Sequence, residues 1–290
     1  MLLEREDVNP NQADTEYGRT PLSWAAEYGH EKVVRMLLGR EGVNPNRPDT
    51  KYGLTPLSWA AENGHPRVVK VLLDRGDINP NQADTKYGKT PLSWAIRKGH
   101  DGIVKMLLER EDVNPNQPET KYGQTPLSWA AENGHLEVVK MLLEREDVDP
   151  NQADTEYGWT ALSRAAKYGH SEVMKIFLER EDVNPNQAGT NYGVTPLSWA
   201  AEYGHSEVVK MLLEREDVDP NQADTENGLT PLSWAAQYGH DGIVKMLLER
   251  KDVRAATLGN ASQPRRLRFS PKDKKESRRS YWNWTMPILI

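Results

Sequence analysis

Two short apolar patterns alternate along the chain with polar loops. In residues 18–53, Thr20 stands before a proline, a pair suited to the start of a helix, and apolar residues follow at helical spacing from Leu22. Gly29 suits the left-handed conformation just past a helix end. A second apolar stripe predicts another helix over about residues 31–40, and a loop rich in Asn, Pro and Asp follows it.

This pattern returns every 35 residues. The stretch TPLSWAAEYGH at residues 20–30 has counterparts beginning at 55, 90, 125, 160, 195 and 230, and all seven histidines fall on this period. Helices of about eight to ten residues are too short to be stable alone in water. Each unit must therefore be covered by its neighbours, and the chain is predicted to be a solenoid of stacked repeats.

The repeated pattern G-x-T-P-L-x-x-A-A-x-x-G-H-x-x-V-V-x-x-L-L resembles the ankyrin repeat, and the match covers about residues 1–253. The resemblance implies an all-α ankyrin-repeat solenoid of helix–turn–helix units with projecting hairpin or loop fingers. Long, nearly identical repeats of this type are similar to arrays of filamentous fungi. Three features depart from the family: Ser23 and its equivalents stand where the family usually has histidine, the period is longer, with the surplus in the Asn-Pro-Asn loop, and most second helices end in EREDV without the usual glycine.

The expected organisation has three parts. Residues 1–17 correspond to a partial repeat, since Met1-Leu2-Leu3 aligns with the second half of a helix. Residues 18–253 hold seven repeats, and residues 254–290 form a basic tail expected to be disordered.

Comparison of the repeats with one another separates constant positions from variable ones. Constant positions are expected to serve the stack, whereas four variable rows, named after Glu16, Arg19, Glu27 and Tyr28, are free to serve another purpose. The resemblance implies that these rows line the concave groove that grips a protein partner; the bland alternative is drift on a solvated face. The candidate protein-binding residues are Glu16, Arg19, Glu27, Tyr28, Lys51, Leu54, Asn63, Lys86, Lys89, Arg97, Lys98, Lys121, Gln124, Trp159, Lys167, Tyr168, Val194, Tyr203, Leu229 and Tyr238.

Within these rows the basic residues gather in the second to fourth repeats, which favours a partner with an acidic segment. Glu62 and Glu132 interrupt this basic patch. Trp159 has two readings of equal weight, an exposed contact residue or a side chain that leans on its neighbour.

The histidines and tryptophans are expected to be structural. Helices one repeat apart lie 8–10 Å from each other, too far for equivalent histidines to share a zinc ion, so they are expected to bond loop backbone. The tryptophan stripe of Trp24 and its counterparts follows the apolar core and predicts a packing ladder, which Arg164 interrupts. No nucleophile–base pair or phosphate-binding motif stands out, so the prediction is a non-enzyme without metal, cofactor or small-molecule substrate.

Charge is divided unevenly: the tail carries nine Lys and Arg against two Asp and Glu, whereas the remaining residues carry 28 against 41. The chain has no cysteine and no apolar run near the roughly 18 residues of a membrane span. These features favour an intracellular, cytoplasmic protein without membrane contact, with the nucleus as an alternative. Two other functions stay open: a recognition fragment of a nucleotide-dependent, immune-type receptor, and association with nucleic acid through the basic tail.

Overall fold

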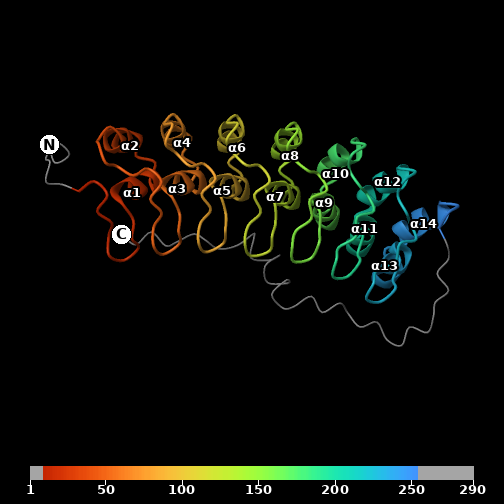
Figure 1. The fold of residues 1–290 in the computed structure, drawn as a ribbon. Helices are drawn as coiled ribbons and strands as arrows, with labels where there is room; N and C mark the ends of the chain where they lie inside the picture. The colour runs from red at the N-terminus through yellow and green to blue at the C-terminus, as the bar shows by residue number, and fades with distance from the viewer. Residues whose placement is uncertain (1–8, 254–290) are drawn as a thin grey trace. The chain divides into compact units, whose positions relative to one another are not determined.

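The computed structural model describes residues 9–253, and within this range the chain forms fourteen helices arranged in seven pairs (Figure 1). The first helices of the pairs are α1 (Pro21–Glu27), α3 (Pro56–Glu62), α5 (Pro91–Lys98), α7 (Pro126–Asn133), α9 (Ala161–Tyr168), α11 (Pro196–Tyr203) and α13 (Pro231–Tyr238). The second helices are α2 (Glu31–Leu38), α4 (Pro66–Leu73), α6 (Asp101–Leu108), α8 (Leu136–Leu143), α10 (Ser171–Leu178), α12 (Ser206–Glu214) and α14 (Asp241–Glu249).

The odd-numbered helices form one row, with the even-numbered helices on one side and the loop fingers on the other (Figure 1). No strand occurs in the described part of the chain, and the fingers are built from turns. The all-α solenoid of helix–turn–helix units with projecting loop fingers, predicted from the sequence, is therefore confirmed. The expectations for the chain before Asn9 and for the tail 254–290 lie outside the described residues.

Each first helix begins at the predicted Thr-Pro pair. Thr20 caps α1 by accepting a hydrogen bond from the backbone N–H of Ser23. The same cap forms at Thr160, although Ala161 replaces proline there, so α9 keeps its full length. The turn after α1 needs glycine for two reasons: Gly29 has φ of 71°, and a Cβ built on it would lie 2.6 Å from Nδ1 of His65.

Small and branched apolar side chains fill the space between neighbouring repeats. In the second repeat, Ala60, Ala61, Val69 and Leu72 have no exposed surface, and the tryptophan of this repeat, Trp59, is 7% exposed. Alanine at two positions of every first helix but α5 lets successive helices approach closely. The tryptophan stripe is part of this packing, as the sequence predicts, with Trp199 and Trp234 almost fully buried.

Histidines at the turn between the two helices join several repeats to the repeat before them. The Nε2 atom of His65 lies 2.8 Å from the carbonyl oxygen of Glu27, at the end of the preceding first helix. The same contact recurs for His100, His170, His205 and His240. Because a helix end leaves its last carbonyls without intrahelical partners, each histidine satisfies a group that the preceding repeat exposes.

A second connection uses the arginine that follows each second helix. Arg75 donates from Nη1 to the carbonyl oxygen of Leu38, 2.7 Å away in the preceding repeat, while its other nitrogens bind Asp77. This arrangement returns through Arg250. The arginine and aspartate that follow the second helices therefore have a structural role.

The Asn-Pro-Asn loop supplies the third connection. Asn46 donates from its side chain to the carbonyl oxygen of Asp77 in the next repeat and accepts from the N–H of Asn79, at 2.6 and 2.8 Å. The same pair of bonds links Asn81 to the third repeat. The surplus residues of the long period thus form a ladder of amide side chains along one edge of the stack.

His170→Ala removes the connection between the fourth and fifth repeats and leaves the carbonyl of Glu132 without its partner. We expect the free energy of unfolding to fall by about 1–3 kcal/mol, measured by urea denaturation. The matched control is Lys175→Ala, an exposed position on α10, which should change stability by less than about 0.5 kcal/mol. If the two variants were equally stable, the hydrogen bond of His170 would not stabilise the fold.

Candidate protein-binding groove

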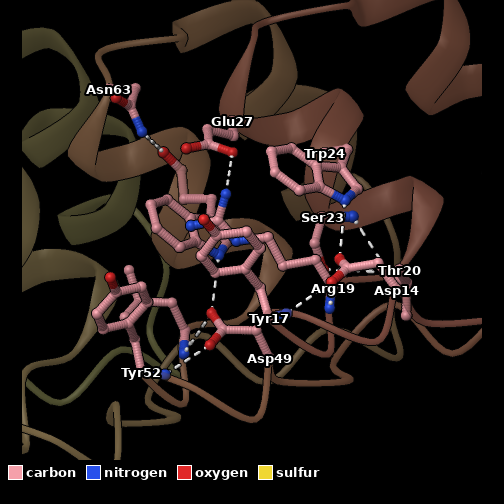
Figure 2. A network of polar contacts seen from close by, with 12 residues as sticks. Asp14, Tyr17, Arg19, Thr20, Ser23, Trp24, Glu27, Asp49, Tyr52 and Asn63 are labelled. Carbon is pink, nitrogen blue, oxygen red and sulfur yellow. Dashed lines mark hydrogen bonds and ion pairs between the residues drawn. The ribbon is translucent and has the colours of Figure 1, made fainter. Parts of the chain in front are cut away.

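An aspartate at the base of each of the first three fingers holds the finger against its helix (Figure 2). The carboxylate of Asp14 accepts hydrogen bonds from the backbone N–H groups of Tyr17 and Arg19 and from the indole N–H of Trp24, at 2.6, 3.1 and 3.1 Å. The bond from Tyr17 is the main cause that lowers the pKa of Asp14. Asp49 and Asp84 repeat this arrangement in the next two repeats.

Finger and helix share one face. The ring of Tyr17 meets Trp24 edge-on, with centroids 6.1 Å apart, and Trp24 stacks on Tyr28 at 6.0 Å. Tyr28 in turn stacks on His30 at the turn to the second helix. The rows of Glu16, Glu27 and Tyr28 therefore border a continuous surface that runs from the finger to the end of the first helix.

The structure places the candidate residues in three environments. Exposed are Glu16, Tyr28, Lys51, Asn63, Lys86, Arg97, Lys98, Lys121, Tyr203 and Tyr238. Partly buried are Glu27, Lys167, Tyr168 and Leu229. Buried are Arg19, Leu54, Lys89, Gln124, Trp159 and Val194, none more than 6% exposed. For these last six residues, the prediction that the row of Arg19 faces a partner is wrong, because each side chain is buried inside the stack.

Arg19 shows what this buried row does. Its guanidinium lies 4.5 Å from the ring centroid of Trp24 and 3.9 Å from that of Trp59 in the next repeat, and it pairs with Glu27 at 2.5 Å (Figure 2). The side chain is thus a filler between two tryptophans, anchored by one carboxylate. Residues at this row vary because the space they fill differs from one junction to the next.

Lys89 fills its junction as an ion pair. Its ammonium bonds the carboxylate of Glu119, which replaces aspartate at the base of the next finger. Burial lowers the pKa of Lys89 and raises the pKa of Glu119, so desolvation offsets part of their attraction. Because Glu119 turns toward Lys89, the indole N–H of Trp129 has no hydrogen-bond partner among the described residues.

Trp159 fills its junction by size. The indole packs on Tyr157 and Trp199, each with ring centroids 4.9 Å apart. The base of the next finger is Gly189, where a Cβ would come within 2.7 Å of the indole, so the large side chain requires the small one. Of the two readings of Trp159, the buried one is correct.

Arg164 occupies the tryptophan position of the fifth repeat without disrupting it. Its guanidinium takes the place of the indole N–H and bonds Asp154 at 2.7 Å, and it reaches Glu132 of the preceding repeat at 2.6 Å. The pairs formed by Lys89 with Glu119 and by Trp159 with Gly189 can be recognised in the sequence. In each pair, a residue that is unusual for its position in the repeat is followed 30 positions later by another unusual residue.

The exposed cations form the surface that remains available. Lys51, Lys86 and Lys121 stand on three successive fingers, where their ammonium groups lie 4.2–5.5 Å from tyrosine ring centroids. A hydrogen bond that the ammonium of Lys86 donates to the side-chain oxygen of Tyr87 raises the pKa of this lysine. We call these three lysines, with Arg97 and Lys98 at the end of α5, the basic face.

The two glutamates that interrupt the basic face are engaged elsewhere. Glu132 is taken up by Arg164 and by the side chain of Gln124. Glu62 pairs with Lys98 at 3.4 Å and so neutralises part of the charge of this lysine. Among residues 9–253, no ion pair is present for Lys51, Lys86 or Arg97, so the positive charge of the basic face is carried by exposed side chains.

Glu202 is the exception among the acidic residues of this surface. It is 8% exposed, and burial raises its pKa to about 7, against the attraction of Lys167 and a hydrogen bond from Tyr238. Near neutral pH this carboxyl is therefore partly protonated, in contrast to an exposed glutamate.

Residues 9–253 contain no group of three or more His, Asp or Glu arranged to hold a metal ion. None of their helices combines the length and apolar character that a membrane span requires.

Comparison with known proteins agrees with the geometry. The family model for ankyrin repeats in sets of three copies matches overlapping windows of the chain from residues 1–84 to residues 182–257. No curated protein matches the chain significantly.

The junction between Lys89 and Glu119 allows a test of compensation. Lys89→Leu strands a buried carboxylate and should lower the free energy of unfolding by about 3–5 kcal/mol. The double variant Lys89→Leu/Glu119→Asp recreates the pair Leu54 and Asp84 of the preceding junction and returns an acceptor to Trp129, so most of that loss should be recovered. Urea denaturation measures both; a double variant as unstable as the single one would show that the two positions are independent.

Glu202 predicts a pH-dependent stability. Because burial raises the pKa of Glu202 from the 4.5 of an unperturbed glutamate to about 7, the folded chain binds more protons than the unfolded chain between these pH values, and its stability falls as pH rises through them. Glu202→Gln removes this loss, so the variant should gain up to about 3 kcal/mol over the parent between pH 4.5 and pH 8. Urea denaturation at several pH values measures the difference in the free energy of unfolding between the two proteins. A difference that does not change with pH would rule out a buried carboxyl with a raised pKa.

Proposed function

The chain belongs to the ankyrin-repeat family, and on that premise we propose that it is a non-catalytic module that binds a protein partner along the surface of its fingers and first helices. Ankyrin repeats are generic protein–protein interaction modules, and the family is typically non-enzymatic. The absence of cysteine fits a partner in a reducing compartment such as the cytoplasm.

The observation that carries the proposal is the basic face. Its cations are exposed on neighbouring fingers and at the end of α5, while the nearby carboxylates of Glu132 and Glu119 are paired with buried cations. Such a surface attracts an acidic segment and accelerates its encounter with the groove. The tyrosines beneath the lysines add apolar contact, so the partner is an acidic peptide segment with interspersed apolar residues.

Lys51→Glu/Lys86→Glu/Lys121→Glu tests this function in the full chain. The probe is a fluorescein-labelled peptide of twelve residues with alternating glutamate and leucine, and its binding is followed by anisotropy at 50 mM salt. We expect the variant to bind at least about tenfold more weakly than the parent, because three favourable charges become repulsive.

The matched control is Lys70→Glu/Lys105→Glu/Lys175→Glu. It changes the net charge by the same amount at exposed positions of second helices, and it should bind the peptide as the parent does within about twofold. If both triple variants lost the same affinity for the peptide, the effect would come from the net charge of the protein and not from the basic face. Binding of a random single-stranded DNA of equal charge as tight as that of the peptide would replace the protein partner with nucleic acid.

A further inference from the structure

Glutamate recurs at one position near the end of the first helix, and in three repeats a cation neutralises it. Glu27 pairs with Arg19, in the row of Arg19 of the same repeat, at 2.5 Å. Glu62 pairs with the last residue of the next first helix, and Glu132 pairs with the residue at the next tryptophan position, at 3.4 and 2.6 Å. The stack thus has three places from which a cation can reach this carboxylate.

All three places are without a cation around Glu202. The row of Arg19 holds Val194 here, the end of the next first helix holds Tyr238, and the next tryptophan position holds Trp234. The Oε2 atom of Glu202 is buried and has no hydrogen-bond partner among residues 9–253. A buried carboxylate without a cation is costly, so this position is either kept protonated or completed by a group from outside.

None of the charged groups around Glu202 in the described residues forms an ion pair with its carboxylate. Lys167 of α9 attracts the carboxylate, but its ammonium lies over the rings of Trp159 and Trp199, at 4.2 and 4.7 Å from their centroids. Asp224, in the loop before α13, repels it. From α13 Tyr238 gives a hydrogen bond, and His240 bonds only the backbone carbonyl of Glu202, at 3.0 Å.

Two exposed aromatic residues lie near Glu202: Tyr203 follows it in α11, and Tyr238 of α13 donates a hydrogen bond to its carboxylate. Tyr203 and Tyr238 are 45% and 43% exposed, and each is supported by a buried tryptophan of its own helix, with centroids 6.0 and 6.1 Å apart. Ring faces attract cations, and an arginine guanidinium also stacks on them. The chain already uses this combination internally, where Arg19 lies between two tryptophans and pairs with Glu27.

We propose that a basic side chain of the bound partner, arginine by preference, lies against Tyr203 and Tyr238 and pairs with Glu202. This inference rests on the proposed function and adds a direction to it: the acidic part of the partner lies over the second to fourth repeats, and its arginine lies over the sixth and seventh. Three repeats at 8–10 Å each separate Arg97 from Glu202, about 25–30 Å, which an extended segment of about eight to ten residues spans.

The test uses two pairs of labelled peptides. Each peptide carries a block of four glutamates and, nine residues to one side, either arginine or citrulline, its neutral isostere; the second pair places this residue on the other side of the block. At pH 8 we expect arginine to tighten binding to the full chain by roughly tenfold over citrulline in one of the two pairs, because one charged pair forms. Lowering the pH to 6 should reduce this ratio toward one, since the carboxyl becomes protonated.

Two variants locate the effect. Glu202→Gln should bring the ratio of arginine to citrulline to one while the citrulline peptides bind as before, and Glu172→Gln, an exposed position on α10 outside the groove, should leave the ratio as in the parent. Equal binding of arginine and citrulline peptides by the parent overturns the inference and leaves the basic face intact. No binding of any peptide overturns the inference together with the proposed function.

Discussion

The junction between one repeat and the next is the interaction on which this protein depends. A pair of eight-residue helices cannot order itself, and each repeat leaves carbonyl groups open at its helix ends. The next repeat closes them, with His65 at the end of α1 and Arg75 at the end of α2, while Asn46 and Asn79 connect the loops. These bonds are directed at backbone atoms, so they work with any side chains between them. That independence lets the chain vary what fills each junction.

The variation is constrained by neighbours. Where a junction holds Lys89, the next finger supplies Glu119; where it holds Trp159, the next finger gives up its side chain at Gly189. Buried polar and aromatic groups tolerate few alternatives, since an unpaired charge or an overlap of atoms costs several kcal/mol. The repeats are therefore nearly identical in sequence, but each one fits its own neighbours and could not exchange places with another.

This division also determines the electrostatics of the groove. Three cations are buried at junctions, where they contact carboxylates or aromatic rings: Arg19, Lys89 and Arg164. The exposed positive charge comes from neighbouring positions, such as Lys51 and Arg97, whereas Glu202 is a buried carboxyl for which no junction provides a cation. Charged residues that hold the repeats together and charged residues that stay exposed thus occupy adjacent positions of the same short segments.

The sequence by itself determined the period, the two helices of each repeat, their caps at Thr20 and Gly29 and the structural role of the histidines, because these depend on local propensity and on a pattern repeated seven times. It also identified exposed members of the candidate surface, including Lys86, Arg97 and Tyr203. It misplaced the row of Arg19, where variation suggested freedom. Whether a variable side chain faces a partner or a neighbouring repeat depends on contacts between residues 30 or more positions apart, and only the stacked structure brings those residues together.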